Sequence, residues 1–195
     1  MSKSTDTRAG ILQQAFELIY QKGYQATSID EIIARTNVTK GAFFYHFKNK
    51  EEMGLAVIDE ILYTGITPYM EAALSQSGDI RRDLYTMMEG LLLKNPFFIV
   101  EYGCPAVNMI EEMAPLNESF KKALVRILDR WQAAIEQAVK RAQAQQQLSA
   151  EHRPKQLATY IISNYAGIRN TGKLRGKGAY KTFLAEYKRY LEQLI

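Results

Sequence analysis

A run of small, basic and aromatic residues near position 40 has the composition of a nucleic-acid contact. Small side chains let the N-terminus of a helix lie close to base edges in the major groove, and lysine adds a contact to phosphate or guanine. Tyr45 and His46 follow within two helical turns and can reach phosphates or bases. We therefore expect bases to be read by Thr39, Lys40, Gly41 and Ala42.

A second basic segment follows directly. Lys48, Asn49 and Lys50 stand where another helix is expected to begin, with Asn49 as its cap. Unpaired backbone N–H groups and the helix dipole favour an anion at such a position. This segment is therefore expected to meet a DNA phosphate.

These residues need short helices to position them, and the sequence predicts such helices. Apolar spacing predicts a helix over residues 6–22 that ends at Gly23, and Ser28 with Glu31 forms a capping-box pattern for a helix over residues 28–36. A turn at Asn37 and Val38 then leads to a helix over residues 39–46. Two short helices around a tight turn are typical of a helix-turn-helix, whose core is expected to include Phe43 and Phe47.

The remaining sequence shows helical periodicity and no sustained strand pattern, so the fold class is all-α. Asp79 and Asn117 are expected to cap two of the later helices. The segment Gly172–Gly178 is expected to be a basic turn. The predicted later helices cover residues 79–94, 106–113, 117–147, 154–171 and 179–195.

Composition narrows the function classes. The chain has 195 residues, 47% of them hydrophobic, with no apolar run near the ~20 residues of a membrane span and no signal peptide. A single cysteine cannot form an internal disulfide, which favours the cytoplasm. Residues 1–50 hold seven basic and four acidic side chains. That excess can attract phosphate, although on charge alone a solvated surface is the simpler explanation.

Two other function classes fit the sequence less well. Only two histidines occur, and neither stands in a Ser-His-Asp or metal-ligand spacing, so no enzyme, metal or cofactor is expected. The glycine-rich basic segment at residues 172–178 follows a helix rather than a strand, which argues against a phosphate loop. A helical binding module without DNA contact is the other alternative, and it predicts no salt-dependent DNA binding.

The spacing of residues 8–55 resembles the N-terminal domain of the tetracycline repressor (TetR/AcrR-like) family. The resemblance is carried by Gly23-Tyr24, Thr27-Ser28-Ile29 and the run from Val38 to Glu51. It implies about nine helices: a three-helix DNA-binding domain over residues 1–50, and a ligand-binding and dimerisation domain over residues 51–195.

Roles at individual positions follow from the resemblance. Thr27 or Ser28 matches a capping hydroxyl near a phosphate, and Lys50 matches a lysine that meets the DNA backbone. Phe44 stands where the family usually has a phosphate-binding tyrosine, a contact that a phenyl ring cannot make and that Tyr45 or His46 would take over.

The family also implies a ligand pocket among the middle helices and a homodimer through the last two. For most of the pocket candidates, ordinary core packing is the competing interpretation. Cys104 is interpreted either as a core thiol or as a sensor of electrophiles and oxidants. In the family fold, Lys173, in the predicted turn at residues 172–178, is expected to approach this thiol. The ligand or sensor candidates are Tyr102, Cys104, Asn108, Met109, Trp131, Asn164, Tyr165 and Lys173.

The expected function is a sequence-specific transcriptional regulator with double-stranded operator DNA as its partner. A two-fold dimer implies a palindromic operator, and an unknown small molecule shifts the dimer away from its DNA-binding state. Membranes are not expected as partners.

Overall fold

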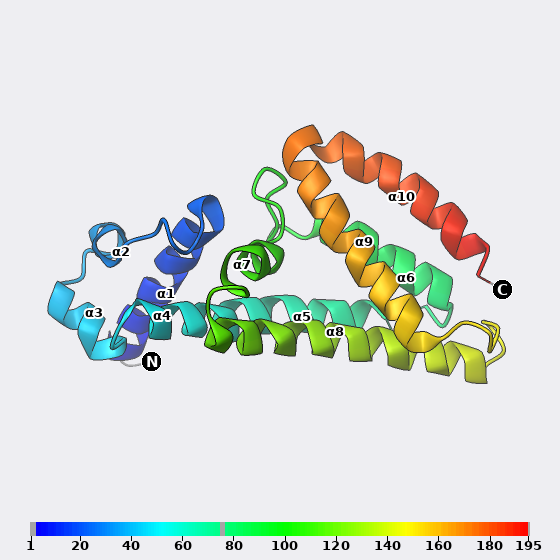
Figure 1. Cartoon of the computed structure of the whole chain (residues 1–195), viewed down its shortest axis with the longest axis horizontal. Helices are drawn as coiled ribbons and strands as arrows, with labels where there is room; N and C mark the ends of the chain where they lie inside the picture. The colour runs from blue at the N-terminus through cyan, green and yellow to red at the C-terminus, as the bar shows by residue number, and fades with distance from the viewer. Residues whose placement is uncertain (1–2, 75–76, 195) are drawn as a thin grey trace. The chain divides into compact units, whose positions relative to one another are not determined.

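The computed structural model describes residues 3–74 and 77–194. Figure 1 shows the helices that they form. Their bounds are α1 Lys3–Lys22, α2 Ile29–Thr36, α3 Lys40–His46, α4 Lys50–Ala56, α5 Tyr63–Ala73, α6 Ile80–Glu89, α7 Pro105–Met113, α8 Glu118–Ala144, α9 Pro154–Arg175 and α10 Lys177–Glu192.

Two π-helical segments continue neighbouring α-helices. Val57–Leu62 joins α4 to α5, and Gly90–Lys94 extends α6. Over the described ranges the chain therefore forms nine continuous helices and no strand. The prediction of an all-α fold with about nine helices is confirmed.

Local capping places the short N-terminal helices as predicted. The Ser28 side chain accepts from the Glu31 amide while the Glu31 side chain accepts from the Ser28 amide, which is a complete capping box. Thr39 and Asn49 accept from the third residue after each of them and so begin α3 and α4. Asn37 takes the left-handed conformation, φ 53°, which ends α2.

The expected turn at Gly172–Gly178 is wrong. Helix α9 continues to Arg175, so Lys173 lies on a helix, and only Gly176 breaks the path with φ +68°. Gly172 is small for another reason: a Cβ there would lie 2.2 Å from Cε1 of Tyr180. The glycine therefore marks a close packing contact rather than a turn.

The chain divides into two compact units. The first contains the residues up to Gly65 together with Pro105–Arg126, and the second contains Ile66–Cys104 with residues 127 onward. In the second unit, α9 and α10 form an antiparallel hairpin (Figure 1). A functional boundary near residue 50 stays a prediction.

The core of the first unit confirms two predicted positions. Phe43 and Phe47 are 0% and 1% exposed. They pack with the apolar face of α1, and α2 adds Ile32. Helix α3 is thereby fixed on its inner side, which leaves its outer side to solvent.

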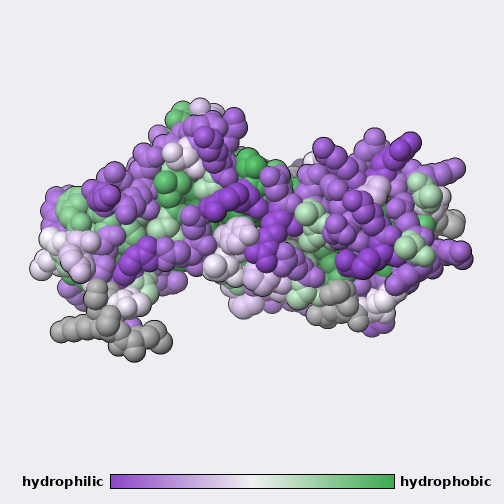
Figure 2. All heavy atoms as spheres, turned by 90° about the horizontal axis from the view of Figure 1, so that it is seen from below, coloured by the Kyte–Doolittle hydropathy of each residue, from purple (hydrophilic) through white to green (hydrophobic). Residues whose placement is uncertain are grey.

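The surface facing the viewer in Figure 2 is mostly hydrophilic, with apolar side chains in small groups. Across the two described ranges, no helix combines the length and apolar character that a membrane span needs. The same residues bring together no cluster of His, Cys, Asp or Glu suited to a metal ion.

Candidate nucleic-acid interface

The outer face of α3 carries the predicted base-reading residues. Thr39, Lys40 and Gly41 are exposed, and Tyr45 is 79% exposed. The Tyr45 ring meets the edge of His46, with centroids 5.0 Å apart. Phe44 is 44% exposed, so it too lies at the surface. The structure thus presents these side chains outward from a helix whose other side is locked in the core.

Space in front of the helix is open at Gly41. A Cβ added there meets only the Thr39 hydroxyl, at 3.9 Å. The neighbouring Lys40 ammonium donates to the Asp30 carboxylate at 3.1 Å. Both side chains are mostly exposed, so this ion pair is worth little and can be exchanged for a phosphate or base.

The start of α4 is capped within the protein. Asn49 accepts from the Glu52 amide, and Glu52 accepts from the Lys48 amide, each at 2.8 Å. The Lys50 ammonium donates to the Gln25 carbonyl at 3.1 Å. Burial, the largest cause, lowers the pKa of Lys50. Lys50 is therefore turned towards the α1–α2 turn rather than extended into solvent.

The two candidate hydroxyls before α2 differ in their surroundings. Thr27 is 1% exposed and donates to the Gly23 carbonyl at 2.8 Å. Ser28 is exposed and caps the helix. Of the two alternatives, Ser28 is the one whose hydroxyl lies at the surface.

Sequence reasoning missed Glu112, which organises the turn before α2. Its carboxylate accepts from the backbone amides of Tyr24 at 2.8 Å and Gln25 at 2.7 Å. Burial, together with the charges of Glu51 and Glu112, raises the pKa of Tyr24 to about 12. The partners lie more than 80 positions apart in the chain, so local spacing contained no signal for them.

In the second unit, several effector candidates come together. The Tyr165 ring meets Trp131 edge-on with centroids 5.1 Å apart, and the Cys104 thiol lies near enough to its hydroxyl to add to the rise of the tyrosine pKa. Burial raises the pKa of Tyr165 well above its usual range. Cys104 is 2% exposed, and the Lys173 stem lies against Gly103, with Cε 2.4 Å from a Cβ placed there.

The other effector candidates lie apart from this cluster. Asn108 and Met109 belong to the first unit, where they line a cavity of about 10 Å³ beside α1. That volume suffices for about one water. Asn164 donates to the Tyr160 carbonyl of its own helix at 2.8 Å. Tyr102 is half-buried in the segment before α7.

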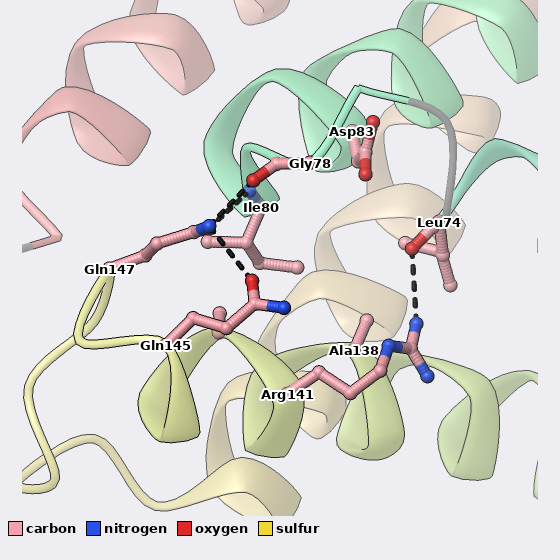
Figure 3. A pocket seen from close by; sticks show the side chains of 9 residues that line it. Leu74, Gly78, Ile80, Asp83, Ala138, Arg141, Gln145 and Gln147 are labelled. Carbon is pink, nitrogen blue, oxygen red and sulfur yellow. Dashed lines mark hydrogen bonds between the residues drawn. The ribbon is translucent and has the colours of Figure 1, made fainter.

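A larger cavity of about 160 Å³ opens in the second unit between the start of α6 and the end of α8 (Figure 3). Arg141 donates to the Leu74 carbonyl at 3.2 Å, and Gln147 donates to the Gly78 carbonyl at 2.6 Å. None of the predicted effector candidates lines it.

The most deeply buried charge, Arg169, was also missed. It is 0% exposed and belongs to the Tyr165 cluster. A signal did exist: Ile161, Tyr165 and Arg169 recur every four residues, which places the arginine on the buried face of α9.

Two family models match the chain. Residues 11–57 match the model described as bacterial regulatory proteins, tetR family, and residues 82–186 match a tetracyclin repressor-like C-terminal domain. The matches include α3 with its outward side chains and most of the second unit.

Individual proteins agree with these matches. The transcriptional regulator AcuR of Cereibacter sphaeroides is 31% identical over 169 residues, which is 84% of this chain and 75% of AcuR. The HTH-type transcriptional repressor NemR of Escherichia coli is 23% identical over 176 residues, 89% of this chain and 88% of NemR. The crystal structure of a TetR transcriptional regulator from Chloroflexus aurantiacus superimposes with a TM-score of 0.88 at 23% identity, covering 100% of this chain and 98% of that one.

Proposed function

Because the chain belongs to the TetR family of bacterial regulatory proteins and is therefore a DNA-binding transcriptional regulator, we propose that it is a homodimeric repressor released from a palindromic operator by a small ligand. The observation that carries the proposal is the outward face of α3, where Gly41 leaves open space beside Lys40 and Tyr45. Such a surface admits the edges of bases in a major groove.

The DNA contacts are assigned from position along the helices, since Ala42, His46 and Lys50 are half-buried while the other assigned surface residues are exposed. Thr39, Lys40, Gly41 and Ala42 lie at the start of α3, and Tyr45 and His46 lie at its end. Ser28, Lys48 and Lys50 would meet the backbone, which requires Lys50 to exchange the Gln25 carbonyl for a phosphate. Thr27 supports this surface from inside, because its hydroxyl is already bound to Gly23.

Dimerisation is proposed through α9 and α10. Helix α9 exposes two large apolar side chains, Tyr160 at 47% and Leu174 at 88%. Two helices from each subunit would bury these in a four-helix arrangement. Sedimentation of the wild type and Leu174→Glu tests this, with a monomeric variant as the expected result.

The DNA-binding test uses the DNA upstream of the protein's own gene, with fluorescence anisotropy measured across a salt series. Gly41→Leu should fold and dimerise normally, because a Cβ at Gly41 meets only the Thr39 hydroxyl, at 3.9 Å. It should lose specific binding at least about 100-fold, because the leucine side chain would keep α3 from approaching the base edges in the major groove. Gly10→Leu, in open space on α1 and outside both the proposed base-reading face and the proposed dimer helices, is the matched control. Lys40→Ala with Tyr45→Ala should also lose binding.

Specific, salt-sensitive binding that survives in Gly41→Leu would contradict the proposed use of α3. If the folded wild-type dimer does not bind this fragment, a genome-wide fragment selection replaces it. If that selection also recovers no bound DNA, the protein is better explained as a helical binding module without DNA contact.

Cys104 carries a second proposed role as a sensor of electrophiles and oxidants. Its support is the interaction of the thiol with Tyr165 and the position of the Lys173 stem beside Gly103. Against it stands the burial of the thiol, which suits a core residue. Operator release by hydrogen peroxide in the wild type but not in Cys104→Ser is expected for a sensor, and equal behaviour of the two proteins would assign Cys104 to the core.

A further inference from the structure

The second unit encloses a guanidinium group among neutral partners. Arg169 is fully buried, and its Nε donates to the Tyr165 hydroxyl at 3.1 Å. One terminal nitrogen donates to the Tyr180 hydroxyl at 3.4 Å, and the other donates to the Leu91 carbonyl. The rings of Phe98, Tyr165 and Tyr180 lie 4.3, 5.3 and 5.5 Å from the guanidinium carbon.

The positive charge of Arg169 is not paired with a carboxylate in the part of the chain that the structure describes. Across residues 3–74 and 77–194, no Asp or Glu forms an ion pair with Arg169. Asp83 is buried, but its carboxylate accepts from the Ser77 amide at 2.9 Å. A guanidinium does not lose its proton in proteins, and a buried charge without a counter-charge is costly. The cluster is therefore short of one negative charge.

The guanidinium keeps two unused donors, the number that the two oxygens of a carboxylate accept from. Arginine has five N–H bonds, and three are used here, so each terminal nitrogen keeps one N–H. Such a pair matches the two oxygens of a carboxylate. The Tyr180 hydroxyl accepts from Arg169 and keeps its own proton as a third donor.

Gly172 makes this third donor possible. A Cβ at position 172 would lie 2.4 Å from the Tyr180 hydroxyl oxygen. The missing side chain thus lets the tyrosine approach α9 and reach the guanidinium one turn earlier on the same helix.

We propose that Arg169 and Tyr180 form the binding site of a small monocarboxylate, and that this anion is the effector ligand. The effector part rests on the proposed function. Because the guanidinium is fully buried with three aromatic rings near it, the ligand must be small, with a short apolar tail beside its carboxylate. Phe98 belongs to the irregular segment between residues 94 and 105, and movement of that segment opens the way in.

The test measures thermal unfolding and calorimetric binding of the full-length protein with acetate, propionate, butyrate and benzoate. Propionamide is the uncharged control, and sodium chloride matches the ionic strength. At one hundred times its Kd, a bound carboxylate should raise the Tm by about 5–10 °C, and propionamide should not. Tyr180→Phe should weaken binding about 5- to 10-fold, Arg169→Lys more strongly, and Arg169→Met should abolish it.

Absence of a saturable shift with all four carboxylates, or an equal shift in Arg169→Met, overturns the proposal. If Arg169→Met does not fold, Tyr180→Phe and Arg169→Lys decide, because an unchanged Kd in both also overturns it. Cys104→Ser tests whether the neighbouring cysteine side chain, rather than an external ligand, fills the position beside Arg169. Unchanged binding in this variant supports an external ligand. Binding that appears only in this variant means that the cysteine side chain fills the position in the wild type, and it overturns the proposal.

Operator binding is measured in parallel. Loss of the operator complex on addition of the bound carboxylate supports the effector assignment. Carboxylate binding without release supports the site and overturns its role as the effector site. A wild type that binds no operator defeats the proposed function, while the unfolding measurements still decide the site.

Discussion

Replacing Glu112 tests whether α7 fixes the geometry of the DNA-binding helices. The carboxylate accepts two consecutive backbone amides, those of Tyr24 and Gln25, at 2.8 and 2.7 Å. Both belong to the turn between α1 and α2, where Gly23 has φ +92°. Glu112→Ala would leave both amides without their acceptor.

The magnitude follows from the exposure of each amide. Hydrogen bonds to charged groups contribute about 1.5–3 kcal/mol each. Gln25 is exposed, so water replaces its lost partner, whereas Tyr24 is 8% exposed and its amide is partly buried. Counting mainly the Tyr24 bond, we expect Glu112→Ala to lower the free energy of unfolding by about 2 kcal/mol. For a chain of this size that is a fall in Tm of about 4–8 °C.

The assay is thermal and urea unfolding followed by circular dichroism. Glu112→Gln keeps one acceptor oxygen and should lose about half as much stability. Asp129→Ala, on the exposed side of α8, is the matched control and should stay within about 0.5 kcal/mol of the wild type. A Tm of Glu112→Ala equal to that of the control would refute the role given to this carboxylate. Operator affinity should fall with stability, because the same turn leads into α2.

Three further predictions concern the first unit. A hydrogen bond from Lys22, the largest cause, lowers the pKa of Glu31 to about 2. The ionised Glu31 carboxylate should stabilise α2 fully above pH ~4.5, and this stabilisation should be lost as the pH falls towards ~2. An acid titration followed by circular dichroism should show the loss in the wild type and not in Glu31→Ala. Gly54→Ala should destabilise the unit by about 1–3 kcal/mol, because its Cβ would lie 2.5 Å from the Tyr24 ring; unchanged urea unfolding would count against that contact. Phe44→Tyr should tighten operator binding and steepen its salt dependence, as seen by anisotropy, because a hydroxyl is restored where the family has a phosphate contact; equal salt slopes would show that no phosphate is in reach.

Residues close in sequence made the helix-turn-helix predictable. Ser28 and Glu31 are three positions apart, and Thr39 and Asn49 act on amides three residues further on. Such contacts depend on spacing alone. Phe43 was likewise assignable to the core, because its position on the helix follows from the same periodicity.

Contacts between separate structural elements account for what the sequence did not reveal. Gly172 was interpreted as part of a turn, since glycine commonly ends helices. Its small size instead accommodates Tyr180 from α10. Glu112 and its amide partners lie 88 and 87 positions apart in the chain. The eight effector candidates were chosen by residue type, and type alone does not tell that Asn108 and Trp131 belong to different units.

The distribution of arginine partners sharpens the case for an anion at Arg169. Arg8, Arg126 and Arg130 each pair with a carboxylate, and all three pairs are partly exposed to solvent. Solvent already screens such pairs, so they add little stability. Arg169 has the greatest need of a counter-charge and has only neutral acceptors. A buried apolar side chain of similar volume would avoid the desolvation penalty altogether. Stability of the fold therefore does not explain a cation at this position, whereas binding of a carboxylate does.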